Sequence, residues 1–272
     1  MTMIKIDTSN TLYLKYLHFS RHHHLKHFVS TRVGGVSQGP GEGLNIGFHA
    51  HDQDSNVIRN REILAQSLEI SVDSFCFLNQ VHSDQVAVVD HTARGRGVKN
   101  AQNTIPQTDA IITQSPDVCL VVLSADCVGV LFYDPVQQVI GAAHSGWRGT
   151  VKKIAAKTVE AMQVNFGSKP EDILVGLGPG ISPEVYEVGG EVVEEVEKAY
   201  GSIFEYVTYP NYTKKPHFNI WEAIRQSLID TGVSAKNIIT SGLCSYRNPS
   251  LFFSHRRDEG KTGRFATGIM LG

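Results

Sequence analysis

Three polar side chains interrupt or end apolar, strand-like stretches of the sequence, and they are the groups best suited to chemistry. They are His82, Cys127 and His144. Two imidazoles and a thiolate suit zinc, and three protein ligands leave a fourth position for water or substrate, as in a catalytic zinc site. Without a metal, the same groups could form a cysteine–histidine pair with Cys127 as the nucleophile. Spacing alone proves neither, because a core thiol and two surface histidines would give the same pattern.

Two of these groups must be positioned by a run of predicted strands. Val118–Leu123 and Val128–Tyr133 are apolar and rich in β-branched residues, which predicts two buried strands with Cys127 at the break between them. Val139–Ala143 predicts a further strand, and His144 follows at its end. Reactive groups displayed at strand ends on a rigid core are a common way to build a site.

The rest of the chain alternates strand and helix patterns. Apolar runs bounded by turn residues predict strands at 4–17 (a pair), 75–78, 86–89, from 111 onward, 173–177, 238–240 and 265–271. Near-helical spacing of apolar residues predicts helices at 56–68, 151–162, 191–200 and 220–230, and Gly167 is expected to stop the second of them. His82 lies in the polar segment between two of these strands. No repeat or low-complexity linker is found, which favours one interlocked α+β domain over residues 1–272.

Other polar residues could bind a ligand or serve the fold alone. Arg148 could hold an anion or brace the turn ahead of the predicted helix. Arg256 and Arg257 could grip a phosphate or a ribose edge, although exposed surface charge is the default interpretation. Asp126 could orient a ligand or cap a turn. The glycine-rich loop VSQGPGEGLNIG lacks the features of a P-loop or a dinucleotide-binding loop, so its glycines are expected to serve tight turns.

Composition and charge limit the classes of protein. A net charge of -2 over 272 residues argues against a nucleic-acid-binding surface, and no apolar run approaches the ~20 residues that cross a bilayer. The amino terminus has no signal-peptide pattern, and four cysteines without a CxxC pair fit free thiols in a reducing cytoplasm. The histidine run at 22–24 is expected to be solvated surface. Nothing in the residues specifies an oligomeric state.

Six motifs occur in an order that is informative: NQVHSDQV, TDAIIT, SADCVGVLFYDP, AAHSGWRGT, GLGPGISPEVYEVG and SHRRDEGKTGR. Together they resemble the YfiH family, also called the multicopper polyphenol oxidase or laccase-domain family. TRVGGVSQG and GLNIGFH fit the same family, so the resemblance runs from about Thr31 to the carboxyl end. It implies a layered α/β/β/α sandwich and a metal site whose ligands are His82, Cys127 and His144.

The resemblance also implies an activity on purine nucleosides. The expected reactions are phosphorolysis of adenosine, inosine and S-methyl-5'-thioadenosine to the free base and ribose 1-phosphate or methylthioribose 1-phosphate, and deamination of adenosine. The expected partners are therefore purine nucleosides and phosphate, with Arg148, Arg256 or Arg257 holding the phosphate. Zn²⁺ is the expected metal, with copper possible because its intrinsic affinity is greater.

Three other functions stay open. One is a cysteine–histidine hydrolase or deamidase in which Cys127 forms a covalent intermediate with His144 as base. Another is a copper-dependent polyphenol oxidase, although multicopper oxidases need several copper centres and this chain has no His-x-His pair around the site. The last is a metal or nucleoside binder without turnover. The chain also departs from the family pattern at Gly129, where proline is common, and at His255, where tyrosine is commoner.

Overall fold

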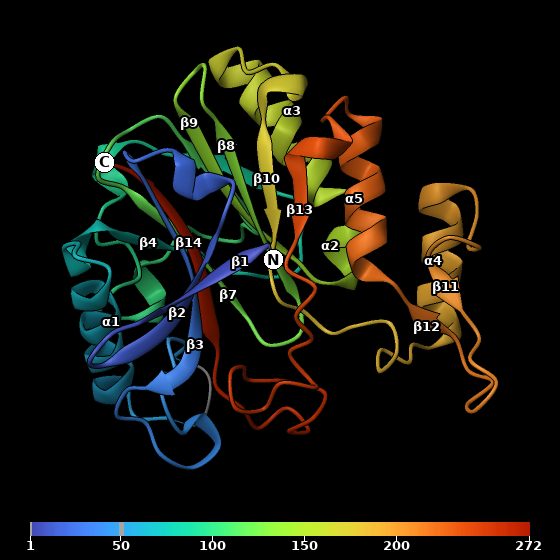
Figure 1. The fold of residues 1–272 in the computed structure, drawn as a ribbon, viewed down its shortest axis with the longest axis horizontal. Helices are drawn as coiled ribbons and strands as arrows, with labels where there is room; N and C mark the ends of the chain where they lie inside the picture. The colour runs from blue at the N-terminus through green and yellow to red at the C-terminus, as the bar shows by residue number, and fades with distance from the viewer. Residues whose placement is uncertain (1, 49–51) are drawn as a thin grey trace.

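The chain folds into four layers, namely helix, sheet, sheet and helix, as the sequence predicts (Figure 1). The computed structural model describes residues 2–48 and 52–272. Helix α1 (Asp54–Ser67) packs on the outer face of a first sheet, and α3 (Ile154–Phe166) and α5 (Ile220–Asp230) pack on the outer face of a second sheet. Helix α4 and a small hairpin extend from the helical side of the second sheet (Figure 1).

Each sheet has six strands. The first sheet has the order β1 (Met3–Asp7), β2 (Thr11–Tyr16), β3 (Leu25–Gly34), β14 (Phe265–Leu271), β7 (Cys119–Ser124) and β4 (Phe75–Phe77). The second has the order β13 (Ile238–Thr240), β10 (Leu174–Leu177), β8 (Val128–Asp134), β9 (Val139–Ser145), β6 (Ala110–Thr113) and β5 (Val86–Val88). The hairpin consists of β11 (Val207–Thr208) and β12 (His217–Phe218). The helices are α1 (Asp54–Ser67), α2 (Trp147–Val151), α3 (Ile154–Phe166), α4 (Gly190–Tyr200) and α5 (Ile220–Asp230).

The central strands are apolar throughout because both of their faces are covered. Along β8, Val130 and Phe132 pack toward the helices, whereas Leu131 and Tyr133 pack between the sheets. Every residue of β8 is buried. A strand in such a position has no solvated face, so its sequence is a continuous apolar run and not an alternation. The apolar runs on either side of Cys127 have this origin.

The two sheets approach each other closely. Gly176 on β10 faces the ring of Tyr16 on β2, and a Cβ added at Gly176 would lie 2.9 Å from two atoms of that ring. Only a glycine leaves room for the tyrosine there, because Cβ contacts below 3.0 Å are not tolerated. The close approach of the two sheets at this point therefore depends on the absence of a side chain at Gly176.

Most predicted elements are confirmed, and one helix begins differently. The helix predicted over 151–162 is divided between two helices. Lys153 has φ 60°, in the left-handed region, and this interrupts the helix between α2 and α3. Gly167 ends α3 as predicted, in the left-handed conformation with φ 70°. The strand predicted at 139–143 extends to Ser145, so His144 is the penultimate residue of β9. None of the described helices is both long and apolar enough to span a bilayer.

Two chain segments pass from the first sheet to the second, and each carries one of the candidate ligands. The first connects β4 to β5 and carries His82, and the second connects β7 to β8 and carries Cys127. The side-chain amide of Gln80 joins the first passage to β7, because it donates to the Leu123 carbonyl and accepts from the Leu123 amide, both at 2.8 Å. The two passages are thus held side by side.

Candidate metal and active site

The structure brings the three predicted side chains together. One ligand atom each from His82, Cys127 and His144 lies within 4.8 Å of the other two. The Sγ of Cys127 is 3.9 Å from Nε2 of His82, and the two imidazole rings lie edge to face at 4.9 Å between centroids. His144 is buried, Cys127 is half-buried and His82 is exposed, so the cluster is open on one side.

A buried carboxylate orients both histidines. Asp109, which precedes β6, accepts a hydrogen bond at 2.9 Å from Nδ1 of His144. It also accepts from the backbone amides of Val81, His82 and Ser83 at 3.1, 3.1 and 2.6 Å. These bonds hold the backbone of His82 in the left-handed region at φ 59°, which a residue other than glycine rarely adopts. Asp109 therefore leaves Nε2 of His144 for the cluster and fixes the turn that presents His82.

The charges of the cluster favour a thiolate. Burial by itself would raise the pKa of Cys127, but the charge of His144 and hydrogen bonds from His144 and His82 lower it to about 6. Burial opposes protonation of His144, yet the neighbouring Cys127 and Asp109 raise the pKa of that imidazole. The pKa of Asp109 is lowered despite its burial, because its carboxylate accepts from His144 and Ser83. These shifts favour a thiolate beside an imidazolium in the metal-free site.

A glycine keeps space between the ligands. Gly146 follows β9, and a Cβ at this position would lie 2.8 Å from Sγ of Cys127 and 3.0 Å from Cδ2 of His82. A methyl group there would occupy the space between the thiol and the imidazole. Two nitrogen donors and one sulfur donor around a space kept free of side chains fit a zinc-sized ion. The hydrogen bond from Nδ1 of His144 to the carboxylate of Asp109 is the usual support of a metal-bound histidine.

The cluster opens into a cavity of about 750 Å³, a volume within the range of small-molecule sites. The lining of the cavity combines apolar and aromatic side chains with arginines. The residues that line it include Phe48, Arg61, Phe77, Asp126, Arg148, Tyr186, Arg256 and Arg264. A ligand of nucleoside size can therefore reach all three members of the cluster.

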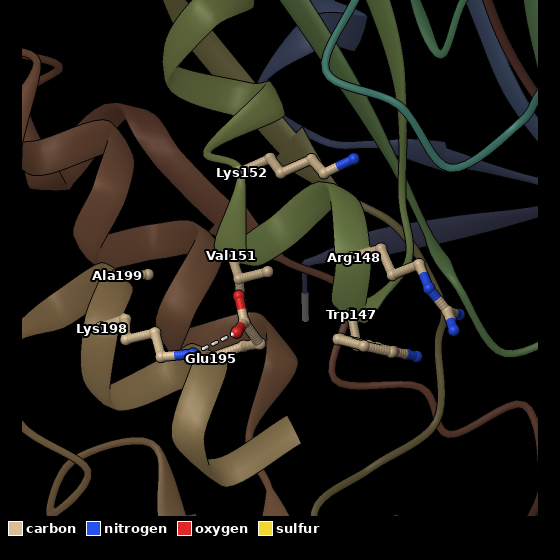
Figure 2. A pocket seen from close by; sticks show the side chains of 7 residues that line it. All are labelled: Trp147, Arg148, Val151, Lys152, Glu195, Lys198 and Ala199. Atoms are coloured by element: carbon tan, nitrogen blue, oxygen red, sulfur yellow. Dashed lines mark hydrogen bonds and ion pairs between the residues drawn. The ribbon is translucent and has the colours of Figure 1, made fainter. Parts of the chain in front are cut away.

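A second hollow of about 390 Å³ lies on the other side of α2, against α4 (Figure 2). Trp147 and Arg148 line both spaces. In Figure 2, Lys198 and Glu195 of α4 form an ion pair at 2.7 Å that faces α2. This hollow contains none of the three candidate ligands, so the cavity at the cluster is the better candidate for the site of chemistry.

The structure places the three predicted substrate-binding arginines differently. Arg148 is exposed, stacks on Trp147 at 4.2 Å and lines the cavity. Arg256 also lines the cavity, but both of its terminal nitrogens donate to the Glu187 carbonyl at 2.9 Å. Arg257 is not among the described residues that line the cavity. Its guanidinium donates to the Asp258 carboxylate and to the carbonyls of Ser245, Tyr246 and Phe252.

Asp126 has a structural part beside the thiol. Its carboxylate accepts at 2.6 Å from both the Ser245 hydroxyl and the backbone amide of Arg256, and its backbone has φ 91°. It joins the segment after β13 to the passage that carries Cys127, and no hydrogen bond with a described metal-ligand candidate is formed. Asp126 therefore serves the fold by tying two distant segments together, and its hydrogen bonds do not orient a metal-ligand candidate.

Two residues that matter at this site were not predicted from the sequence. Asp109 lies in the motif TDAIIT, and an acidic residue directly before a buried apolar strand was a usable sign of a buried carboxylate with partners. Arg264 lines the cavity beside Cys127 and directly precedes β14. It ends the motif SHRRDEGKTGR, but its residue type alone carries no comparable sign of a ligand-binding role.

The protein is a sandwich of two sheets with a candidate metal site of three ligands, two histidines and one cysteine. A carboxylate supports this site, and the site opens into a cavity. Residues 26–272 match the family described as multi-copper polyphenol oxidoreductase laccase. The chain belongs to this family, which is the one that the sequence motifs resemble.

Similar proteins of this family carry enzyme names. The chain is 40% identical to "Purine nucleoside phosphorylase YlmD" of Bacillus subtilis (strain 168) over 88% of this chain and 86% of that protein. It is 33% identical to "Adenosine deaminase RL5" of an unknown prokaryotic organism over 89% of this chain and 92% of that protein. The crystal structure of YlmD from Geobacillus stearothermophilus superposes with a TM-score of 0.92 at 31% identity, covering 99% of each chain. A crystal structure of YfiH from Bacillus licheniformis also gives 0.92, at 32% identity, covering 98% of this chain and 99% of that one.

Proposed function

We propose that this protein is a metal-dependent purine nucleoside enzyme. Its reactions are phosphorolysis of adenosine, inosine and S-methyl-5'-thioadenosine to the free base and the sugar 1-phosphate, together with deamination of adenosine. The observation that carries the proposal is the His82–Cys127–His144 cluster in a nucleoside-sized cavity. The names of the similar proteins, a phosphorylase and a deaminase, support the same substrate class. Four free cysteines favour a reducing compartment, and we place the enzyme in the cytoplasm.

The cluster is the proposed metal site, with zinc as the resident ion. His82, Cys127 and His144 would hold it, and the thiolate favoured by the local charges is the protonation state that a metal requires. When bound, zinc would supply a Lewis acid that lowers the pKa of a coordinated water. Copper binds such donors more tightly in general and would compete in vitro.

The chain's own groups account for the requirements of phosphorolysis. A phosphate oxygen forms a bond to the anomeric carbon, the glycosidic C–N bond breaks, and its electron pair remains on the base nitrogen, which takes up a proton. His82 lines the cavity and could give that proton only while its imidazole is not bound to the metal. Arginines of the cavity lining would stabilise the phosphate, and its apolar and aromatic side chains would favour a flat base over bulk water.

Product analysis tests this function. Purified protein is incubated with adenosine, with and without phosphate, and the products are separated by chromatography. We expect adenine and ribose 1-phosphate only with phosphate, and inosine in both mixtures. A Cys127→Ala control should lose ribose 1-phosphate formation. Absence of ribose 1-phosphate from the wild-type reaction, or equal formation by the control, rejects the phosphorylase.

A second candidate, the cysteine–histidine hydrolase or deamidase, is favoured by one observation. Asp109, His144 and Cys127 lie in the order of a carboxylate, a base and a thiol of lowered pKa, which is how a nucleophilic cysteine is activated. Complete metal removal separates the two candidates. The hydrolase keeps its activity without metal and loses it on alkylation of Cys127, whereas the proposed nucleoside enzyme loses its activity with the metal.

A copper-dependent polyphenol oxidase is a weaker alternative, although the family description names that activity. Among residues 2–48 and 52–272, one group of histidine, cysteine and acidic side chains meets the geometry of a metal site. An oxidase with several copper centres needs several such groups of ligands. Metal analysis of protein purified without a histidine tag distinguishes one bound ion per chain from several.

A further inference from the structure

Four arginines line the cavity at the cluster. They differ in how many of their guanidinium nitrogens are already hydrogen-bonded to the protein. Arg61 is buried, donates through Nε, Nη1 and Nη2 to the carbonyls of Ile46 and Val98, and lies between two aromatic rings. Arg256 donates twice to the Glu187 carbonyl. An arginine whose nitrogens already serve backbone carbonyls has little left to offer a ligand.

Arg264 differs in what it leaves unused. Its Nη1 donates to the carbonyls of Thr262 and Gly263 at 2.8 and 2.9 Å, which fixes the position of the guanidinium. Its Nε and Nη2 make no hydrogen bond with any residue that the structure describes, and none of the described carboxylates forms an ion pair with it. A guanidinium with one edge anchored and the other edge free is built to receive a planar or tetrahedral oxyanion.

The backbone of Arg264 is equally well fixed. Its amide donates to Oδ1 of Asn45 at 2.9 Å, and its carbonyl accepts from the Ile46 amide at 3.0 Å. Phe265 is paired with Ser124 across the β14–β7 ladder, so Arg264 lies beside the passage that carries Cys127. Arg264 therefore lines the cavity that contains Cys127 from a hydrogen-bonded backbone directly before β14.

Arg148 is the one cavity arginine whose side chain forms no hydrogen bond with a described residue, and it lacks the support that Arg264 has. It is exposed and rests on the face of Trp147. An exposed guanidinium on a single stacking contact loses more side-chain entropy when it binds than one that is already held. The anchored Arg264 is thus the stronger anion site.

We infer that Arg264 is the anchor for a phosphate dianion next to Cys127, a role that rests on the proposed phosphorylase. In phosphorolysis that dianion is the inorganic phosphate whose oxygen attacks the anomeric carbon. Arg264 binds and orients the phosphate and takes no part in the bonds that form and break. The same chemistry could instead receive the 5'-phosphate of a nucleotide, so the experiment distinguishes these two sources.

Kinetics with two substrates test the inference. Initial rates of ribose 1-phosphate formation are measured against phosphate concentration for wild type, Arg264→Gln, Arg264→Lys and the control Arg59→Gln. Arg59 is an exposed arginine of α1 that is not among the residues lining the cavity. Loss of charge-assisted hydrogen bonds, typically about 1.5–3 kcal/mol, should raise the KM for phosphate about 10-fold to 150-fold in Arg264→Gln. Arg264→Lys should fall between, and phosphate-free deamination of adenosine should keep its KM within about twofold.

Several results would overturn the assignment. A KM for phosphate that stays within about twofold in Arg264→Gln removes Arg264 from the phosphate site. Equal loss of deamination in both Arg264 variants, at an unchanged melting temperature, moves Arg264 to the nucleoside. Weaker binding of adenosine 5'-monophosphate with an unchanged phosphate KM would assign the 5'-phosphate in its place.

Calorimetric titration with inorganic phosphate separates this inference from the proposed function. If the wild type binds phosphate but forms no ribose 1-phosphate, the phosphorylase fails, and the subsite is decided by binding alone. Loss of that binding in Arg264→Gln, with binding kept in Arg59→Gln, supports the subsite. A wild type that binds no phosphate ends both.

Discussion

At the scale of single residues, the site depends on charges that change each other's protonation. Cys127 is a half-buried thiol whose pKa would rise through burial alone, and the proton on His144 reverses that effect. Burial opposes the proton on His144, and the charge of Cys127 and then the hydrogen bond to Asp109 favour it. The buried carboxylate of Asp109 thus contributes to the charge state of a sulfur atom to which it is not hydrogen-bonded.

Alkylation of the metal-free protein tests this arrangement. With a pKa of about 6 in place of the ordinary 9.0, Cys127 should react with iodoacetamide at a rate that rises through pH 6 and is nearly constant above pH 7. Mass spectrometry measures the modified fraction at Cys127, and the three buried cysteines serve as internal controls. A rate that continues to rise toward pH 9 would contradict the lowered pKa. His144→Asn should shift the wild-type midpoint upward.

At the scale of elements, a glycine between β9 and α2 keeps the ligands accessible. Gly146→Ala places a methyl group against Cys127 and His82, so we expect zinc affinity to fall by at least roughly tenfold. The fold should persist, because Gly146 has φ -81°, which alanine adopts freely. Zinc content and melting temperature measure the two effects.

Gly190→Ala is the matched control for this change. Gly190 also stands at the start of a helix, and no described atom lies within 4 Å of an added Cβ. Zinc content should be unchanged in it. Retention of full zinc affinity by Gly146→Ala would show that the ligands bind the ion on another side.

Elements whose position is set by local residue types could be predicted from the sequence, and features set by contacts in the folded chain could not. The strands around Cys127 were predictable because two covered faces leave a continuous apolar run. The break at Lys153 was missed because a lysine in the left-handed region has no sign in sequence, whereas Gly167 marks its own turn. Convergence of His82, Cys127 and His144 was expected from the family resemblance and not from spacing. Arg264 and Arg257 could not be ranked, because the bonds that occupy an arginine exist only in the folded chain.

At the scale of the whole molecule, the packing of the first sheet contains a histidine that cannot be charged easily. His27 on β3 is buried, and its Nε2 accepts from the Tyr16 amide at 2.9 Å. Burial, with a smaller effect of Lys15, lowers the pKa of His27 to about 3. Between the unfolded value of 6.5 and pH 3, the unfolded chain binds a proton that the native chain does not. The free energy of unfolding should therefore fall as the pH drops through this window.

Urea unfolding at pH 7, 6 and 5 measures this contribution. His27→Gln removes the titration and keeps an acceptor for the Tyr16 amide, so its stability should fall less steeply with acid. The difference in slope should approach about 1.4 kcal/mol per pH unit below pH 6. His23→Gln, at an exposed position, should keep the wild-type slope. Parallel curves for His27→Gln and the wild type would show that another group causes the acid sensitivity.

The route of the chain between the sheets has a mechanical consequence for the metal site. His82 and Cys127 lie on two of the chain segments that connect the sheets, whereas His144 belongs to the second sheet alone. An ion held by all three would cross-link these connecting segments to the second sheet. Separation of the two sheets would then strain its bonds to His82 and Cys127. The metal-loaded protein should therefore resist forced or thermal unfolding more than its empty counterpart, and the first movement to be suppressed should be the sliding of one layer over the other.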